Sequence, residues 1–463
     1  MPKVSIIMPS LDVAAYIREC MDSVVCQTLQ DIEIICIDAG SADGTFEILR
    51  EYAKRDPRIK LILSSRKSYG YQMNLGLREA TGDYIGIVET DDFVLPEMFE
   101  ELYTYAKDND ADFVKSDFDI FTTLENGKRI FLEYSLKKHS GIQYNTVFTA
   151  DDFMNRKQTI DVFIWNGIYK REFLLEKNIW FQETSGAAFQ DCGFRYQVVM
   201  KVKRGVYLNH SYYRYRRDNI NSSTYNSKCV AFNLAECKNL INIFQKEKKV
   251  DSKRMDFLAR EIAVIALAPY RELLTWGQPA DGMAAVLEEF RLILKDFINR
   301  GNLRQSSVAE NAWLEIRMFV ENPDFYNYYT RLKAEINAES VKGFLRIIAS
   351  KNEVVIFGCG YIGSCAYCLV RNNGIDNVAA FCDNDRSKWN TSHMECLAIS
   401  PEEASKRFPK ACFLIANAAH SREMQKQLCG YGIGEKQILT FGLQISPLDC
   451  TNVIMRSAQI VCR

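Results

Sequence analysis

The sequence predicts an α/β protein with a mostly parallel N-terminal sheet, a helical middle region and a second, smaller α/β domain. Short runs rich in isoleucine and valine alternate with helical periodicity in the first hundred residues, vanish between about 227 and 340, and return after 350. Such alternation is typical of βαβ units. A length of 463 residues also favours several domains. We expect boundaries at 1–226, 227–340 and 341–463.

Short apolar runs give the strands of the first domain, because buried parallel strands are short and rich in β-branched residues. The predicted strands are Val4–Met8, Ile32–Ile37, Ile59–Leu63 and Tyr84–Val88. Between and after them, apolar residues fall on one helical face: Ile17, Met21, Val24 and Val25, then Phe99, Leu102, Tyr103 and Ala106. Residues 112–224 are less regular and rich in aromatic side chains.

The middle and C-terminal regions differ in their periodicity. Met283–Asn299 and Leu314–Val320 have helical spacing. The second alternation consists of a strand at Val354–Phe357, a helix from about Tyr361 to Asn372, and strands at Val378–Phe381 and Cys412–Ala416. We therefore expect a helical connector followed by an α/β domain.

Charge and hydropathy exclude several classes of protein. Lysine and arginine number 58 against 59 acidic residues, which argues against a nucleic-acid-binding surface. No apolar stretch is long enough to span a membrane, and the N-terminal apolar run is too short for a signal peptide. We expect a cytoplasmic protein. The basic patches at 201–204 and 212–217 are either ordinary basic surface or a peripheral contact with the inner face of the membrane.

The fifteen cysteines are scattered within apolar segments, as expected for buried side chains in a reducing compartment. Cys365 and Cys368 form one Cys-x-x-Cys pair without a second pair or a nearby histidine. The pattern favours packing over a zinc or redox site. It does not predict an oligomeric state.

Residues suited to ligand binding follow three of the predicted strands. They are Pro9-Ser10 after the first, Asp38 to Gly44 after the second, and Glu89-Thr90-Asp91-Asp92 after the fourth. Ligands of an open parallel sheet bind outside the carboxyl ends of its strands, so we expect these residues to meet along one rim.

Three carboxylates so close together repel one another unless a cation lies between them. Capping of the helix that follows Pro96 is the alternative, but a cap uses one aspartate. Hard oxygen ligands without histidine or cysteine favour Mg²⁺ or Mn²⁺, held by Asp91 and Asp92 and completed by phosphate oxygens and water.

The segments VSIIMPSLDVAAYIRECMDSVVCQTLQDIEIICIDAGSADGT and MNLGLREATGDYIGIVETDDFV resemble the nucleotide-sugar-binding half of family 2, GT-A-fold glycosyltransferases from Val4 to about Phe99. The resemblance implies an inverting transferase that binds a nucleotide-sugar, commonly a UDP-sugar, through a divalent metal at an Asp-x-Asp-like motif. By position it assigns residues to the donor: Pro9 and Asp38 at the nucleoside, Ser10 as a further donor-binding residue, Asn74 and Gly76 facing the donor, and Asp91 and Asp92 at the ribose, metal and diphosphate. Two positions depart from the family: Ala39 replaces a second aspartate, which puts uracil specificity in question, and Glu89 replaces the first aspartate of the metal motif.

Later segments resemble the acceptor side of the same family. Asp191 matches the carboxylate that the family uses as catalytic base, with Gln190 in place of glutamate; its alternative role is helix capping. Trp165 either stacks on an acceptor sugar or is buried in the core. Arg216, in a Tyr-Arg segment that ends in Ser222-Ser223, either stabilises the departing diphosphate or belongs to a solvated basic loop.

The C-terminal domain opens on a strand that runs into Gly358-x-Gly360-x-x-Gly363 and then a helix. Asp383 ends the next strand, at about the 20-residue spacing expected of a ribose-binding acid. This part resembles Rossmann-like modules appended to some bacterial transferases. It predicts a nucleotide-binding or structural accessory domain, in which the glycines either contact a nucleotide or serve only the packing of the helix on the sheet.

The sequence thus predicts a metal-dependent glycosyltransferase that moves a hexosyl or N-acetylhexosaminyl group to a glycan or lipid-linked acceptor in bacterial surface polysaccharide synthesis. A sugar nucleotidyltransferase would need a glycine- and basic-rich phosphate loop after the first strand, where this chain has Ser10-Leu11-Asp12-Val13. The sequence leaves two further functions open: a non-catalytic nucleotide-sugar-binding scaffold, and an NAD-dependent oxidoreductase centred on Gly358–Gly363.

Overall fold

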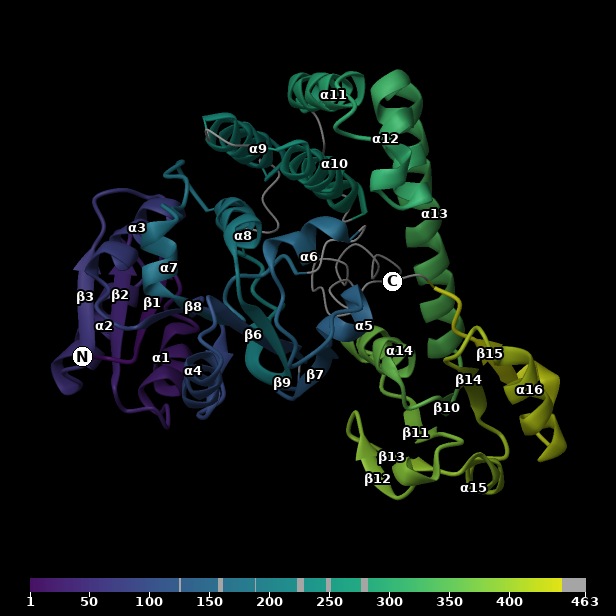
Figure 1. Cartoon of the computed structure of the whole chain (residues 1–463). Coiled ribbons are helices and arrows are strands. Elements are labelled where there is room, and N and C mark those ends of the chain that lie inside the picture. The colour runs from purple at the N-terminus through teal and green to yellow at the C-terminus, as the bar shows by residue number, and fades with distance from the viewer. Residues whose placement is uncertain are drawn as a thin grey trace. The chain divides into compact units, whose positions relative to one another are not determined.

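The computed structural model describes residues 1–124, 126–156, 161–187, 189–222, 229–246, 251–275 and 282–443. Two compact units contain them (Figure 1). The first comprises residues 1–119, 134–215 and 221–331. The second comprises residues 120–133, 216–220 and 332 onward. The predicted boundary at 226/227 lies outside the described residues.

A parallel sheet forms the centre of the first unit. Its strands are β1 (Val4–Ser10), β2 (Ile32–Asp38), β3 (Ile59–Leu63) and β4 (Tyr84–Ile87). They lie in the order β3-β2-β1-β4, and all three pairings are parallel. Every residue of β1 and β4 is buried, as expected for strands covered on both faces. The α/β class and these four strands are confirmed.

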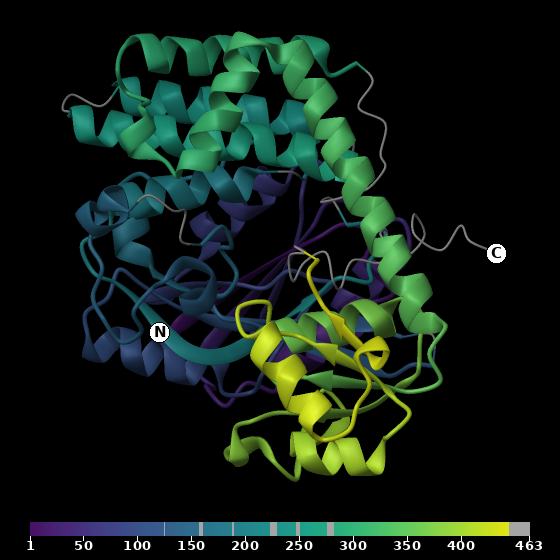
Figure 2. The same ribbon diagram turned by 90° about the vertical axis from the view of Figure 1, so that its right-hand side faces the viewer.

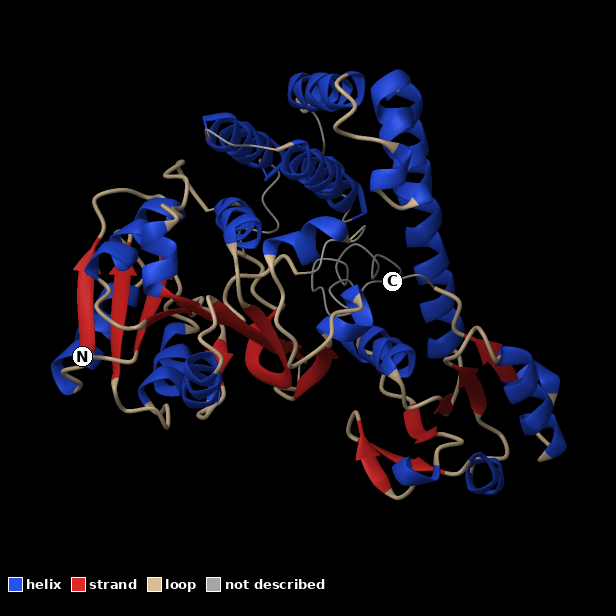
Figure 3. Ribbon diagram, viewed as in Figure 1, coloured by secondary structure: helices blue, strands red, loops and turns tan. Residues whose placement is uncertain are grey.

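Helices flank this sheet, as Figure 3 shows. They are α1 (Ile17–Val25), α2 (Thr45–Arg55), α3 (Tyr69–Glu79) and α4 (Met98–Asp108). On α1, Ile17, Met21 and Val24 are fully buried, so the predicted apolar face is the one that packs. Ser68 caps α3 by accepting a hydrogen bond from the N–H of Tyr71.

The sheet continues beyond β4 with antiparallel strands that the sequence did not predict. These are β5 (Phe93–Val94), β6 (Phe113–Thr123), β7 (Arg129–Tyr134), β8 (Gly167–Lys170) and β9 (Gly205–Arg216). The order beyond β4 is β8-β6-β9-β5, with β7 paired to β6. The pairing of β5 with β9 sets Phe93 opposite Arg214 and Val94 opposite Tyr213, which brings β9 next to the acidic segment after β4.

Short helices lie between these strands: α5 (Leu136–Ser140), α6 (Ala150–Asn155), α7 (Arg171–Glu176) and α8 (Gln190–Lys201). The helical region then comprises α9 (Cys229–Lys246), α10 (Ser252–Thr275), α11 (Ala284–Asn299), α12 (Glu310–Glu321) and α13 (Pro323–Ala349). Figure 2 shows α9 to α12 packed side by side. Among the described residues, no helix has the length and apolar character needed to cross a membrane.

The second unit contains a sheet in the order β12-β13-β11-β10-β14-β15. Its strands are β10 (Val354–Phe357), β11 (Val378–Cys382), β12 (Thr391–His393), β13 (Cys396–Ile399), β14 (Cys412–Ile415) and β15 (Ile438–Thr440). Its helices are α14 (Tyr361–Asn372), α15 (Pro401–Arg407) and α16 (Ser421–Gly430). Leu124, Ile130 and Leu132 belong to the same hydrophobic cluster as residues of α13, β10 and α14.

Candidate active site

The carboxyl ends of β1 and β2 are joined through Asp38, which is fully buried. Its Oδ1 accepts hydrogen bonds from the N–H groups of Gly40 and Ser41, both at 2.9 Å. Its Oδ2 accepts from the hydroxyls of Ser41 at 2.5 Å and Ser10 at 3.1 Å. Four donors therefore hold the carboxylate, and the predicted donor-binding residues Ser10 and Asp38 are in direct contact. Asp38 shapes the loop after β2 rather than offering an open carboxylate.

The acidic segment after β4 is fixed by hydrogen bonds from distant parts of the chain. The hydroxyl of Thr90 donates to the carbonyl of Pro9 at 2.8 Å, which ties this segment to the end of β1. The hydroxyl of Tyr69, at the start of α3, donates to Oε1 of Glu89 at 2.7 Å. The hydroxyl of Tyr213, on β9, donates to Oδ2 of Asp92 at 2.8 Å and accepts from the N–H of Glu89 at 3.0 Å.

These contacts give the three acids different environments. Asp92 is only 1% exposed, whereas Glu89 and Asp91 are half-buried. Burial raises the pKa of Glu89 to about 8; the hydrogen bond from Tyr69 opposes this shift, and the negative charges of Asp91 and Asp191 add to it. Burial therefore favours the protonated form of Glu89. Of the two aspartates after β4, Asp92 is buried and Asp91 is accessible to solvent.

Asp191 comes to the same cluster from a separate segment. It lies in the first turn of α8, which follows Phe189 in the left-handed conformation with φ +64°. Its Oδ1 accepts the N–H of Cys192 at 2.9 Å. Burial raises the pKa of Asp191, and that hydrogen bond and the charge of Arg195 oppose the shift. Because the charge of Asp191 acts on both Glu89 and Tyr69, the predicted base and the acids after β4 lie in one electrostatic neighbourhood.

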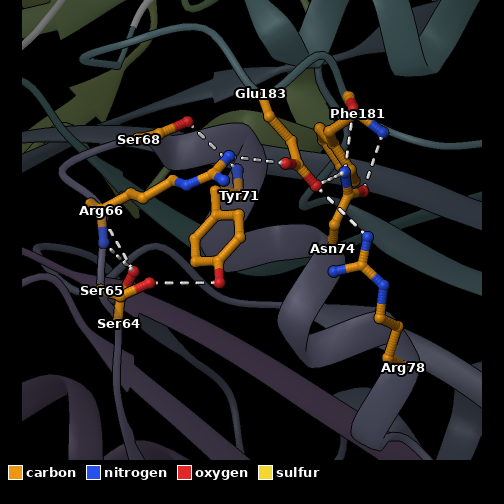
Figure 4. Close-up of polar contacts among 9 residues, drawn as sticks. All are labelled: Ser64, Ser65, Arg66, Ser68, Tyr71, Asn74, Arg78, Phe181 and Glu183. Carbon is orange, nitrogen blue, oxygen red and sulfur yellow. Dashed lines mark hydrogen bonds and ion pairs between the residues drawn. The ribbon is translucent and has the colours of Figure 1, made fainter.

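The loop that leads to Asp191 is attached to α3 (Figure 4). Asn74 on α3 donates to the carbonyl of Phe181 at 2.9 Å and to Oε1 of Glu183 at 3.0 Å, and its Oδ1 accepts the N–H of Phe181 at 3.0 Å. Arg66 and Arg78 each contact the carboxylate of Glu183 at 3.3 Å. Asn74 is 3% exposed. The amide predicted to face the donor is thus engaged with the loop before α8.

Trp165 lies in a cluster of aromatic rings and is 6% exposed. Its ring stacks on Tyr213 with a centroid distance of 4.1 Å and an interplanar angle of 25°. It also contacts Phe118, Phe163 and Tyr215 at 4.7 to 5.0 Å. Trp165 thereby supports the tyrosine that holds Asp92. The sequence left two roles open for Trp165, which were stacking on a sugar and packing in the core. Its surroundings are those of a residue packed in the core.

Arg216 belongs to the second unit. Its guanidinium contacts Asp218 at 3.1 Å and lies over the ring of Phe121 at 4.6 Å. The side chain is 5% exposed, which differs from the solvated basic loop considered from the sequence.

The structure explains why glycine is needed at two of the three positions of the C-terminal motif. Gly358 has φ +123°, a conformation that side chains rarely adopt. A Cβ on Gly363 would overlap the carbonyl of Gly358, whereas a Cβ on Gly360 would meet nothing within 4 Å. Asp383 accepts the N–H of Cys359 at 2.7 Å and contacts Lys388 at 3.1 Å. Gly358, Gly363 and Asp383 therefore build the loop, and packing does not explain Gly360.

The acidic residues after β4 suit a divalent ion whose other ligands are phosphate oxygens and water. Among the described residues, no group of three or more His, Cys, Asp or Glu side chains is arranged to hold a metal. Asp91 is half-exposed and Asp92 already accepts from Tyr213. Mg²⁺ and Mn²⁺ suit such a site, since one or two carboxylates plus phosphate oxygens and water complete their shells.

Sequence reasoning missed Tyr69, Tyr213 and Glu236. Tyr213 lies on a strand that was not predicted, and Tyr69 carries no motif of its own. Glu236 on α9 is 2% exposed, and a Cβ on Gly193 of α8 would overlap its Oε1. No local signal in the sequence joins residues of these different elements.

Comparison with known proteins agrees with this geometry. The model of the family described as Glycosyl transferase family 2 matches residues 5–200. The chain is 33% identical over 228 residues to the uncharacterized glycosyltransferase EpsJ of Bacillus subtilis, which covers 48% of this chain and 63% of EpsJ. It is 33% identical over 215 residues to the cholesterol galactosyltransferase of Borreliella burgdorferi, which covers 46% of this chain and 59% of that protein. The match thus spans less than two thirds of either relative.

Among solved structures, S. aureus TarS 1-349 superimposes with a TM-score of 0.51 at 15% identity, over 73% of this chain and 91% of TarS 1-349. At this identity the likeness concerns the fold, and it agrees with a GT-A sheet. Residues 5–200 of the chain thus match the glycosyl transferase family 2 model, and the likeness to TarS concerns the fold.

Proposed function

We propose that the protein is a metal-dependent inverting glycosyltransferase that moves a sugar from a nucleotide-sugar to a hydroxyl of a glycan or lipid-linked acceptor. One observation carries the proposal: Asp191, from α8, shares an electrostatic neighbourhood with the acids that follow β4. Inverting transfer needs carboxylates in two roles, at the donor diphosphate and at the acceptor hydroxyl. The family of residues 5–200 supports the same reaction.

In this mechanism Asp191 accepts the proton of the acceptor hydroxyl as its oxygen attacks the anomeric carbon. The bond between that carbon and the diphosphate oxygen breaks in the same step, and the nucleoside diphosphate leaves from the opposite face. A base works best when its pKa approaches the working pH, and burial moves the pKa of Asp191 in that direction.

The chain's own residues prepare the donor side. Tyr213 and Tyr69 orient Asp92 and Glu89, and this leaves Asp91 as the half-exposed carboxylate. Asp91, with Asp92 behind it, would hold Mn²⁺ or Mg²⁺. When bound, that ion supplies positive charge to the departing diphosphate.

For the donor we propose a UDP-sugar, and for the pathway the assembly of a bacterial surface polysaccharide at the cytoplasmic side of the membrane. Support comes from the resemblance of the donor half to the family and from relatives in bacteria. Ala39, where the family often has a second aspartate, is buried at 3% exposure, so the base must be recognised without that carboxylate.

Calorimetry with UDP, GDP, CDP and dTDP, each with and without Mn²⁺, tests the donor site. We expect one diphosphate to bind in a metal-dependent manner, and Asp91→Asn to lose this binding. Asp151→Asn changes a carboxylate of the same unit that is 70% exposed and is the matched control. Binding that ignores both the metal and Asp91→Asn would contradict the proposal.

A second experiment separates a transferase from a non-catalytic scaffold. Wild type should release nucleoside diphosphate from the nucleotide-sugar, whereas Asp191→Asn should still bind the diphosphate but lose transfer by at least about 100-fold, as expected for loss of a general base. Transfer by Asp191→Asn at the wild-type rate would reject the assignment of the base. Binding without turnover in wild type would favour the scaffold, and release of pyrophosphate would favour a nucleotidyltransferase.

A further inference from the structure

The sheet of the second unit changes direction at β10. The chain leaves β10 through α14 and returns as β11 on one side, and it later enters β14 on the other side of β10. Ligands of open α/β sheets bind in the crevice outside the carboxyl ends of the strands at such a point. A cavity of about 280 Å³ lies there, lined by Gly358 after β10, by Asp383 and Asn384 after β11, and by Asn417 after β14.

The helix α16 and its N-cap residue also line this cavity, through His420, Glu423 and Gln427. Gln427 and Asn384 exchange two amide hydrogen bonds at 2.8 and 3.1 Å, which ties α16 to the end of β11. His420 Nδ1 lies 2.9 Å from Oε2 of Glu423, within α16 and its N-cap. The lining therefore combines two carboxylates, three amides and an imidazole.

The charges of the lining disfavour a phosphate. Asp383 and Glu423 bring negative charge, and the side chains of Lys388 and His420 are paired with these same carboxylates. Carboxylates and amides instead suit hydroxyl groups, since a carboxylate can accept from two neighbouring hydroxyls and an amide can both donate and accept.

One polar group in the lining of this cavity, the side-chain amide of Asn417, is available to a ligand. The side-chain oxygen of Asn417 accepts the N–H of His420 at 3.2 Å, while its Nδ2 has no hydrogen-bond partner among the described residues. Gly360, where a Cβ would meet nothing within 4 Å, is not one of the residues that line this cavity.

We propose that this cavity binds the vicinal hydroxyls of a ring sugar, either the ribose of a nucleoside or a free glycosyl group, with Glu423 and Asn417 as the recognising side chains. This site belongs to the second unit and is separate from the donor site of the first. Its existence does not depend on the proposed transferase activity.

Ligand-observed NMR on the full chain, in EDTA and without any diphosphate, tests the proposal with three probes: uridine, 2′,3′-dideoxyuridine and methyl β-D-glucopyranoside. We expect saturable binding of uridine, of the glucoside, or of both. Saturation by uridine alone assigns the site to a ribose, and saturation by the glucoside alone assigns it to a glycosyl group. Dideoxyuridine should bind at least about 10-fold more weakly than uridine where uridine binds, since hydrogen bonds to a charged group are lost.

Variants locate the binding. Glu423→Gln and Asn417→Ala should each weaken it at least about 10-fold. Glu402→Gln on α15, an exposed carboxylate of the same unit, and Asp91→Asn in the first unit should leave it unchanged. Absence of saturable binding by both sugars, equal binding of uridine and dideoxyuridine, or binding that survives both Glu423→Gln and Asn417→Ala would overturn the proposal.

Discussion

Asn74 shows how one side chain can connect the two sides of the candidate active site. Both atoms of its amide bond the loop that leads into α8, and none of these contacts involves the acids after β4. We infer that Asn74 is a positioning residue for Asp191. Replacing it with alanine should lower kcat by about 10- to 100-fold, because small displacements of a catalytic group are costly, while KM for the nucleotide-sugar changes little. Steady-state kinetics with separate kcat and KM measures this.

Arg78→Ala is the matched control for Asn74→Ala. It removes an ion pair with the same Glu183 from a side chain that is 50% exposed, and it leaves the bonds between Asn74 and Phe181 in place. Exposed ion pairs contribute little, so kcat should remain within about 2-fold of wild type. A rise in KM for Asn74→Ala with kcat unchanged would instead assign Asn74 to the donor, as its sequence position suggested.

Glu236 gives the molecule a pH-dependent stability. Burial raises the pKa of this carboxyl to about 8, a hydrogen bond from Asn239 opposes the shift, and the charge of Asp191 adds to it. The unfolded chain releases this proton near its ordinary pKa of about 4.3, so between about pH 4.3 and 8 only the folded state keeps it. The free energy of unfolding should therefore fall as pH rises through that window.

Glu236→Gln removes this titration. Relative to wild type, the free energy of unfolding of the variant should increase by about 3–4 kcal/mol between pH 5 and pH 8, at up to about 1.4 kcal/mol for each pH unit. Urea denaturation at the two pH values measures the difference, with the exposed Glu402→Gln as control. An identical pH dependence in wild type and Glu236→Gln would show that Glu236 titrates normally.

At the scale of elements, α8 and α9 meet at Gly193. A Cβ at this position would overlap Oε1 of Glu236, so Gly193→Ala should destabilise the protein by about 1–3 kcal/mol, the usual range for overpacking. Gly343→Ala on α13 is the control, because a Cβ there meets nothing within 4 Å and alanine should stabilise the helix by about 0.5–1 kcal/mol. Denaturation curves of both variants give the comparison.

A double substitution identifies the cause. If the overlap with Glu236 is responsible, Gly193→Ala should cost less in a Glu236→Ala background than in wild type, and the coupling free energy of the cycle reports the difference. Additive effects would mean that α8 and α9 adjust their packing elsewhere.

The elements also show what the sequence could and could not predict. β1, β2 and β4 could be predicted because each is a mostly apolar run that is buried on both faces, and β3 because it is short and rich in isoleucine and leucine, although Lys60 and Leu63 are exposed. β6 was hidden because Lys115, Ser116 and Asp117 interrupt its apolar pattern, although all three are buried. Lys115 is neutralised by Asp161 at 2.7 Å, a partner from a distant segment that no local pattern reveals. The candidate acids were found from their strand ends, whereas Tyr213, which holds Asp92, came from one of the hidden strands.

At the scale of the whole molecule, the second unit is built from segments that are far apart in the sequence. Leu132 is 1% exposed and shares a hydrophobic cluster with Val341, Ile348 and Ile356. Leu132→Ala should therefore destabilise the second unit by about 2–5 kcal/mol, the cost of a cavity left by a buried leucine. Hydrogen exchange should accelerate in β10 and α14, although these elements lie far along the chain from the substitution.

The same experiment distinguishes local from global effects. Amides of β1 and β2 should keep their protection in Leu132→Ala, because these strands belong to the first unit. Phe131→Ala, at a neighbouring side chain that is 37% exposed, is the control and should leave β10 and α14 unchanged. If exchange in β10 and α14 were unaffected by Leu132→Ala, residues 120–133 would not belong to the cooperative core of the second unit, and the contiguous segment from 341 onward would be the folding unit. Acceleration there, with β1 and β2 protected, would mean that a fragment starting at residue 341 lacks part of its own core.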